Sequence, residues 1–240
     1  MPNTKVGRLI AAVIILVGAV LLIAAVFMPW YAEQASATVS GQSITITRNA
    51  YVGLPSSNGT LQYTCSGLPS EISCLSQTSY SSVDSNNTGN IAEAVYFMAI
   101  AGFVLGLIGG IIGLMSRGNP RRATPAFALA VVAMILAIAA VGVFAVALPG
   151  AISSDTPGHT GSGPWSSFIG SSNGSTFGVP VSGTVTWGPA IGWYLALAGF
   201  VVMLIGIILI LRYRKDPPAP APTTMPAPAG APAAAPPPAS

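Results

Sequence analysis

The chain has 240 residues, of which 52% are hydrophobic and only 6% are charged, against roughly 25% charged residues in an ordinary soluble domain. This composition excludes a freely soluble globular protein. The net charge is only +3, and the basic residues are scattered, whereas a nucleic-acid-binding protein gathers them on one face. Nucleic acid is therefore not an expected partner.

Four runs of the chain are long and apolar enough to cross a bilayer. A hydrocarbon core about 30 Å thick needs roughly 20 apolar residues in a helix. Because lipid offers the backbone no hydrogen-bond partners, runs of this kind must be helical. The sequence thus predicts an all-α transmembrane four-helix bundle in contact with lipid, with spans at residues 9–28, 91–115, 123–148 and 190–211.

Positive charge predicts the orientation, because Lys and Arg beside a span stay in the cytoplasm. Eight of the nine basic residues fall on one side of a four-span arrangement, and only Arg48 falls on the other. We therefore expect a multi-pass protein of the plasma membrane with both termini in the cytoplasm. The cytoplasmic segments are residues 1–8, 116–122 and 212–240, and the extracellular loops are residues 29–90 and 149–189.

A cleaved signal peptide is the alternative interpretation of the first span, because Lys5 and Arg8, an apolar run and residues 35–37 (Ala-Ser-Ala) resemble its three parts. The apolar run is longer than the roughly 7–15 residues of a signal core, which favours a retained helix. Tryptophans near the span ends are predicted to anchor the protein at the membrane–water interface, where amphipathic rings prefer to lie. They are Trp30, Trp187 and Trp193.

The two extracellular loops carry strand patterns. In residues 37–47, β-branched residues recur at nearly every second position on either side of a Gly-Gln pair, which predicts a hairpin. Residues 61–65 predict a third strand, and residues 179–187 predict a strand from the second loop beside the first sheet. We therefore expect a small extracellular antiparallel β-sheet above the bundle.

The first loop also holds both cysteines, Cys65 and Cys74. Since this loop lies on the predicted oxidising side of the membrane, we expect a disulfide between them. Two free thiols and a metal-binding pair are the alternatives, although a single histidine leaves few further metal ligands.

Three glycosylation sequons fall in the outer loops and predict glycans in a cell that N-glycosylates its surface proteins. They begin at Asn58, Asn86 and Asn173.

Glycines at small-xxx-small spacing mark the second span. In lipid, helices associate through close backbone approach and dispersion, and glycine permits that approach. Two interpretations remain open: the glycines pack the bundle itself, or they form an exposed face that binds another copy or a partner subunit. The residues concerned are Gly102, Gly106, Gly110 and Gly113, and on the fourth span Gly192, Gly199 and Gly206 recur at seven-residue intervals.

The chain is not expected to be an enzyme or to hold a cofactor or metal. It has one histidine, no phosphate-binding glycine loop and no ionisable residue deep in a span, so acid–base and nucleophilic chemistry lack candidates. An enzyme would have to use His159 with Asp155 and a nearby serine. A small channel or transporter is the other alternative, although no buried charge or broken-helix repeat supports it.

The chain resembles the claudin and peripheral-myelin-protein superfamily of four-span proteins. The resemblance rests on Pro29-Trp30 closing the first span, Leu61 four residues before Cys65, eight residues between Cys65 and Cys74, and Gly192-Trp193 opening the fourth span. It implies a left-handed four-helix bundle topped by an antiparallel sheet, with the disulfide joining two strands. It also implies a non-enzymatic role through contacts with itself or with other membrane subunits, as a surface or adhesion protein or an accessory subunit.

The chain departs from the pattern of this family at positions that bear on function. Gln62 stands in place of a tryptophan three residues before the first cysteine, and Glu93 stands where a basic residue commonly leads into the second span. Paracellular sealing is therefore not implied, and the departures favour a divergent prokaryotic or archaeal member.

Residues 216–240 contain 10 Pro and 9 Ala, which predicts an extended, disordered spacer. The alternative is a ligand for a cytoplasmic SH3-like domain.

Overall fold

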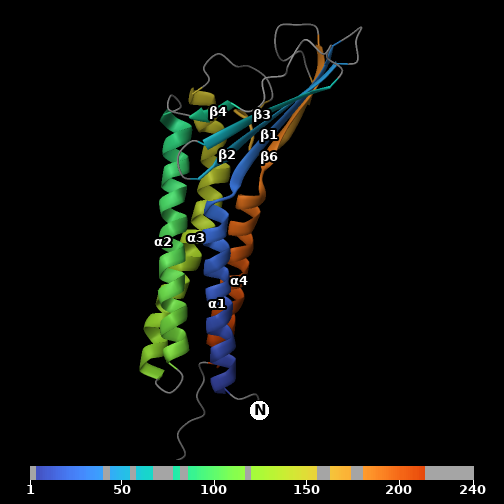
Figure 1. Ribbon diagram of the computed structural model, residues 1–240. Helices are drawn as coiled ribbons and strands as arrows, with labels where there is room; N and C mark the ends of the chain where they lie inside the picture. The colour runs from blue at the N-terminus through green and yellow to red at the C-terminus, as the bar shows by residue number, and fades with distance from the viewer. Residues whose placement is uncertain are drawn as a thin grey trace, which may run out of the picture.

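The fold is described from a computed structural model of the chain. Four long helices run side by side, and a sheet rises from one end of the bundle (Figure 1). The residues that the structure describes are 4–39, 44–54, 58–66, 78–81, 86–116, 120–155, 163–173 and 181–213.

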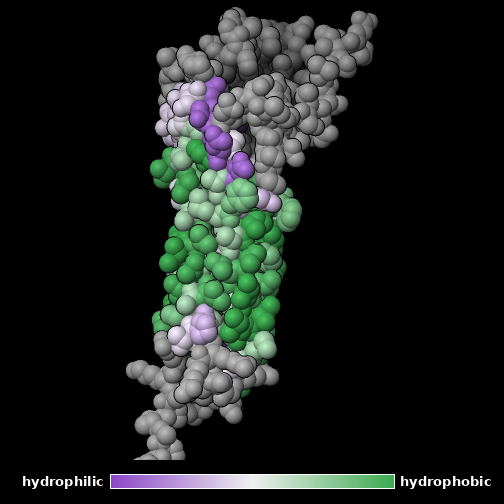
Figure 2. Space-filling view, turned by 90° about the vertical axis from the view of Figure 1, so that its left-hand side faces the viewer, coloured by the Kyte–Doolittle hydropathy of each residue, from purple (hydrophilic) through white to green (hydrophobic). Residues whose placement is uncertain are grey.

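The four helices confirm the predicted spans. Each contains an apolar stretch long enough to cross a membrane, so the chain is a four-span integral membrane protein. Many large apolar side chains of the helices are exposed, and Figure 2 shows them as an apolar band with hydrophilic residues at its two ends. The helices are α1 (Thr4–Val26), α2 (Asn86–Met115), α3 (Pro120–Asp155) and α4 (Ile191–Tyr213).

Two helices extend further on the sheet side than the apolar runs predicted. Helix α2 begins at Asn86 rather than Ile91, and α3 continues through Pro149 to Asp155. Proline removes a single backbone donor, so the helix can continue past Pro149. Both extensions end in polar residues, 86–88 on α2 and 153–155 on α3, which are suited to the region outside the hydrocarbon. The extensions bring the polar ends of α2 and α3 together above the apolar band.

The helices form a closed ring in which α1 packs mainly on α4 and also on α2, α2 packs on α3, and a smaller contact between α3 and α4 completes the circle. The seam between α1 and α4 is tight at two levels. Near the end of the bundle opposite the sheet, the Tyr213 ring covers Gly7, and the Arg8 Nε donates to the carbonyl of Tyr213 at 3.2 Å. In the middle of the seam, a Cβ on Gly199 would lie 2.9 Å from the carbonyl oxygen of Gly18.

The glycines of α2 lie inside the bundle. A Cβ on Gly106 would lie 3.2 Å from the Cβ of Ala19, and one on Gly110 would lie 2.5 Å from Leu16, both on α1. The two other predicted packing glycines, Gly102 and Gly113, face Leu22 and Ala12 of the same helix. These contacts correspond to the intramolecular interpretation of the glycine pattern, and the glycines do not form an exposed face.

The sheet has six antiparallel strands in the order β4-β3-β2-β1-β6-β5. The hairpin is confirmed by the pairing of β1 with β2, in which Val39 lies opposite Ile44. The strand predicted from the second loop is confirmed as β6, which pairs with β1. The strands are β1 (Pro29–Val39), β2 (Ile44–Gly53), β3 (Asn58–Ser66), β4 (Thr78–Ser81), β5 (Gly170–Asn173) and β6 (Val181–Pro189).

We predict that Gly199→Ala lowers the free energy of unfolding by about 1–3 kcal/mol, because the added methyl group meets the backbone of α1 and forces the two helices apart. Gly142→Ala is the matched control, since a Cβ there has no neighbour within 4 Å. It should leave stability unchanged or raise it by up to about 1 kcal/mol through helix propensity. Reversible unfolding in mixed detergent micelles, followed by tryptophan fluorescence, measures both. Equal stability of the two variants would contradict a tight seam.

Candidate functional site

The sheet joins the bundle without a flexible linker. Strand β1 begins three residues after α1 ends, and β6 is separated from α4 by Ala190 alone. The Trp30 indole Nε1 donates to the carbonyl of Ala25 at 2.7 Å, and the amide of Ala190 donates to the carbonyl of Trp30 at 2.9 Å. A Cβ on Gly192 would lie 2.6 Å from the Trp30 ring. Trp30 therefore links both connections, and Gly192 leaves the space that its ring occupies.

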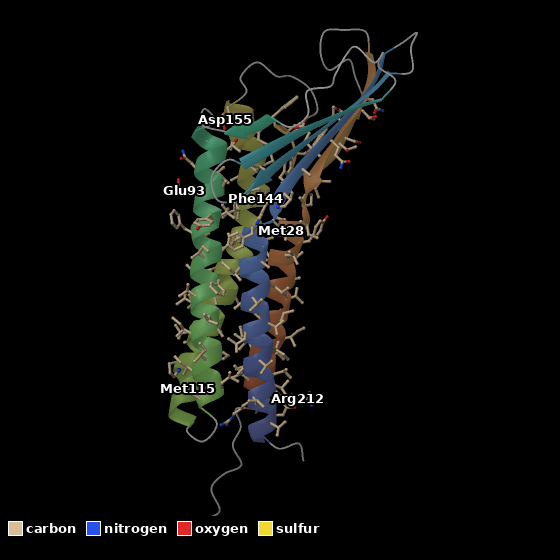
Figure 3. The ribbon with its side chains drawn as sticks, in the orientation of Figure 1. Met28, Glu93, Met115, Phe144, Asp155 and Arg212 are labelled. Carbon is tan, nitrogen blue, oxygen red and sulfur yellow. The ribbon has the colours of Figure 1, made fainter. Side chains whose placement is uncertain are left out.

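Aromatic rings fill the space between the sheet and the bundle, and we call this cluster the aromatic junction. Phe144 contacts Trp30 edge-on at a centroid distance of 5.3 Å and Phe168 at 6.1 Å. Phe168 in turn contacts Tyr31 at 5.6 Å and Trp193 at 5.9 Å. Such pairs add roughly 0.5–1.5 kcal/mol each beyond their burial. The junction therefore couples β1, α3, α4 and the second loop; Figure 3 labels Phe144 at the level where the sheet begins.

The predicted tryptophan anchors need correction. Trp30 is fully buried and Trp187 is 5% exposed, so protein rather than lipid headgroups surrounds both rings. The Trp187 Nε1 donates to the carbonyl of Ser167 at 2.9 Å. Trp193 is half-buried and donates to the carbonyl of Val141 at 3.2 Å, which ties α4 to α3. A tryptophan at a span end has the same sequence signature whether it faces lipid or protein.

Asp155 joins the outer ends of α2 and α3 (Figure 3). One carboxylate oxygen accepts hydrogen bonds from the amide and the side chain of Asn87, at 3.1 and 2.9 Å. The other accepts the amide of Thr88 at 2.8 Å. A carboxylate at this place satisfies otherwise unpaired donors of the first turn of a helix and favours its positive end. Asp155 thus serves α2 as a cap supplied by another helix.

Tyr31 carries a buried hydroxyl without a partner. Its side chain is 2% exposed, and its Oη is the only buried side-chain polar atom in the described part of the chain that makes no hydrogen bond. Burial, reinforced by the negative charge of Glu33, raises the pKa of Tyr31 far above its usual range. The phenol therefore stays neutral and faces apolar neighbours.

The structure describes only some of the remaining predicted site residues. Cys65 lies in β3 opposite Ile46, whereas Cys74 and His159 lie outside the described residues, so the disulfide stays a prediction. Asn58 begins β3 and Asn86 begins α2. Asn173, which ends β5, has an exposed side chain. No group of three or more metal-ligating side chains occurs among the residues described.

The interior of the bundle is apolar. Its buried side chains are mainly alanine, with larger aliphatic residues and Phe144. Within the described ranges Ser116, directly after α2, is the only buried polar residue, and its hydroxyl donates to the carbonyl of Gly113 at 2.8 Å. This part of the bundle therefore lacks a polar path between its helices.

In comparisons with known proteins, no protein-family model matches the chain and no curated protein matches it. The four apolar spans and the antiparallel sheet are the features that it has in common with the layout expected for the claudin and peripheral-myelin-protein superfamily.

We predict that Asp155→Ala lowers the free energy of unfolding by about 1 kcal/mol, within the range of roughly 0.5–2 kcal/mol for loss of a helix cap. Ser153→Ala, an exposed change two residues away, is the matched control and should leave stability unchanged. Asp155→Asn keeps one oxygen acceptor, so its free energy of unfolding should fall between those of Asp155→Ala and Ser153→Ala. Unfolding in mixed micelles measures the series. An Asp155→Ala variant as stable as the control would show that the cap contributes nothing.

We predict that Tyr31→Phe raises the free energy of unfolding by about 1 kcal/mol at neutral pH, since it removes a buried, unpaired hydroxyl. The raised pKa adds a pH dependence. Tyr31 in the folded protein stays protonated above pH about 10, where an unfolded tyrosine ionises. The contribution that the raised pKa of Tyr31 makes to the free energy of unfolding is therefore complete below about pH 10. It is lost as the pH rises towards the folded-state pKa. Wild type should lose stability above pH 10 more steeply than Tyr31→Phe; the opposite order would contradict burial of a neutral phenol.

Proposed function

We propose that the chain is a non-enzymatic protein of the plasma membrane that acts through contacts of its extracellular sheet with other protein molecules. It would serve as a self-associating surface or adhesion protein, or as an accessory subunit of a larger membrane complex, and would be a divergent relative of the claudin and peripheral-myelin-protein superfamily. The observation that carries this proposal is the direct connection of the sheet to α1 and α4 through Trp30. A sheet held in this way presents its surface at a fixed angle to the membrane.

The proposed orientation places both termini in the cytoplasm. The first turns of α1, Arg8 and Arg212 lie at the end of the bundle opposite the sheet, whereas Glu93 and Asp155 lie towards the sheet (Figures 1 and 3). This arrangement supports the positive-inside assignment, under which the sheet, the predicted disulfide and the three sequons would lie outside the cell.

A non-enzymatic role is supported by the use of Asp155 as a helix cap. In the enzyme alternative Asp155 would assist His159, but both carboxylate oxygens of Asp155 accept hydrogen bonds from α2. Withdrawing the carboxylate for proton transfer would leave donors of the first helical turn without partners. The channel alternative lacks support for a related reason, because the described interior of a single bundle is apolar and closely packed. Solute flux into liposomes that contain only this protein would instead favour the channel alternative.

We predict that a photo-crosslinking residue at position 79, in the edge strand β4, forms an adduct of discrete mass with another protein in native membranes. Position 146 is the matched control: Val146 is 83% exposed on the apolar surface of α3, so it should react mainly with lipid. Mass spectrometry of the adduct distinguishes a second copy, expected for self-association, from a different protein, expected for an accessory subunit. Lipid adducts alone at position 79 would contradict the proposed function.

A further inference from the structure

On one face of the sheet, the exposed side chains that the structure describes are uncharged and polar. Along β6, Thr184 and Thr186 are exposed while Val185 and Trp187 are buried. The neighbouring strands add further exposed hydroxyl and amide side chains on both sides of β6. We call the set the neutral face; it consists of Gln34, Ser171, Asn173, Thr184 and Thr186.

The strand register arranges these residues in rows. Thr186 lies between Gln34 of β1 and Ser171 of β5, and Thr184 lies opposite Asn173. The first row continues from Gln34 to residues 49 and 62, an asparagine and a glutamine. The neutral composition therefore extends across the sheet rather than being confined to β6.

The only charged residues in the six strands are Glu33 and Arg48, and both belong to the alternate register. Glu33 lies opposite the buried Trp187, and Arg48 lies opposite Ala35. Exposed strands usually carry charged side chains that keep them soluble and unpaired. Their absence from the neutral face requires another explanation.

The chemistry of the neutral face limits what covers it. Since none of these five side chains is charged, they do not attract phosphates, nucleic acid or acidic polymers. None of the five is an aromatic or arginine side chain, the usual anchors of a protein interface. Hydroxyl and amide groups both donate and accept hydrogen bonds. They fit an uncharged partner rich in hydroxyl groups, which is the chemistry of a neutral glycan.

We infer that the neutral face is covered by an N-linked glycan attached to Asn173. This asparagine begins the sequon Asn173-Gly174-Ser175, is exposed, and ends β5 beside Thr184. The inference rests on the proposed orientation, which places β5 outside the cell. Asn86 differs: it begins a helix, and the next two residues donate their amides to Asp155.

The attachment needs a lipid-linked oligosaccharide as the co-substrate of a transferase. The Nδ2 of Asn173 forms a bond to C1 of the first sugar while the bond from C1 to the lipid phosphate breaks. The phosphate leaves with the bonding electron pair, and one amide proton is transferred to solvent or to a base of the transferase. Only Asn173 and the sequon come from this chain.

A glycan at this place also accounts for the exposed edge of the sheet. Strand β5 lies at one end of the strand order, and an edge strand offers unpaired backbone groups to other strands. A glycan on its last residue obstructs such pairing without charge or proline. The opposite edge, β4, then remains as the side of the sheet for protein contacts.

The first arm of the test is the mass of the full chain purified from its native membranes. We expect a glycan mass that glycosidase removes, that Asn173→Gln and Ser175→Ala each abolish at this site, and that Asn86→Gln leaves in place. Peptide mapping assigns the site directly. An unmodified Asn173 in the native protein overturns the inference.

The second arm tests whether the glycan covers the face. The chain has only two lysines, Lys5 and Lys215, so Thr186→Lys introduces a distinctive amine for a membrane-impermeant label. On intact cells we expect labelling of this variant to rise several-fold after removal of the glycan, whereas labelling of Ser153→Lys, also at an exposed position, stays constant.

Equal labelling of Thr186→Lys before and after glycan removal overturns the covering of the face even where Asn173 is modified. Labelling of Ser153→Lys on intact cells reports the orientation independently of the glycan. The adducts formed at position 79 report the protein contacts. Failure of this inference is therefore distinguishable from failure of the proposed function.

Discussion

The tight seam between α1 and α4 determines where the sheet stands relative to the bundle. Strands β1 and β6 pair with each other within the sheet, and each connects directly to one of these two helices. A change in the distance between α1 and α4 would therefore separate two hydrogen-bonded strands. Gly18 and Gly199 allow the helix backbones to touch, and the Trp30 indole rests on Gly192 at the outer end. Helix packing in the membrane and strand pairing outside it thus support one another.

The same constraint explains the composition of the bundle interior. Between lipid-embedded helices there is little hydrophobic driving force, because the alternative environment of each side chain is also apolar. Close contact and dispersion must then hold the helices together, and small residues give the most contact per helix turn. The buried positions are accordingly dominated by alanine, and large side chains are exposed on the outside of the ring. Large rings are concentrated in the aromatic junction, where the chain leaves the membrane and burial from water again contributes.

The sequence was sufficient to predict the spans and the central strands, because each has a strong periodic or compositional signal: long apolar runs, and β-branched residues at nearly every second position. Strands β4 and β5 have four residues each, too few to show an alternation, and they form by pairing with longer neighbours. The Asp155 cap depends on a partner 68 residues away. Burial of Trp30 and Trp187 was likewise missed, because residue type does not reveal what surrounds an indole. Gly142 and Gly199 show in the same way that residue type does not reveal the surroundings. The space beside Gly142 is open, whereas Gly199 lies in close contact with the backbone of α1.

The distribution of polar groups argues that the surface, rather than the interior, carries the function. The described interior contains one buried polar residue, Ser116, which bonds within its own turn, whereas the sheet has hydroxyl and amide groups exposed in register. An apolar interior made of small residues gives a rigid support but no site for a solute or a proton. The aromatic junction transmits that rigidity to the sheet, so that its edges keep a constant direction relative to the membrane. A fixed direction reduces the orientational freedom lost on association, and many copies confined to one membrane raise the effective concentration of even weak contacts. For the proposed function, a small sheet would then be sufficient for assembly, because the membrane and the seam supply the order that a larger interface would otherwise provide.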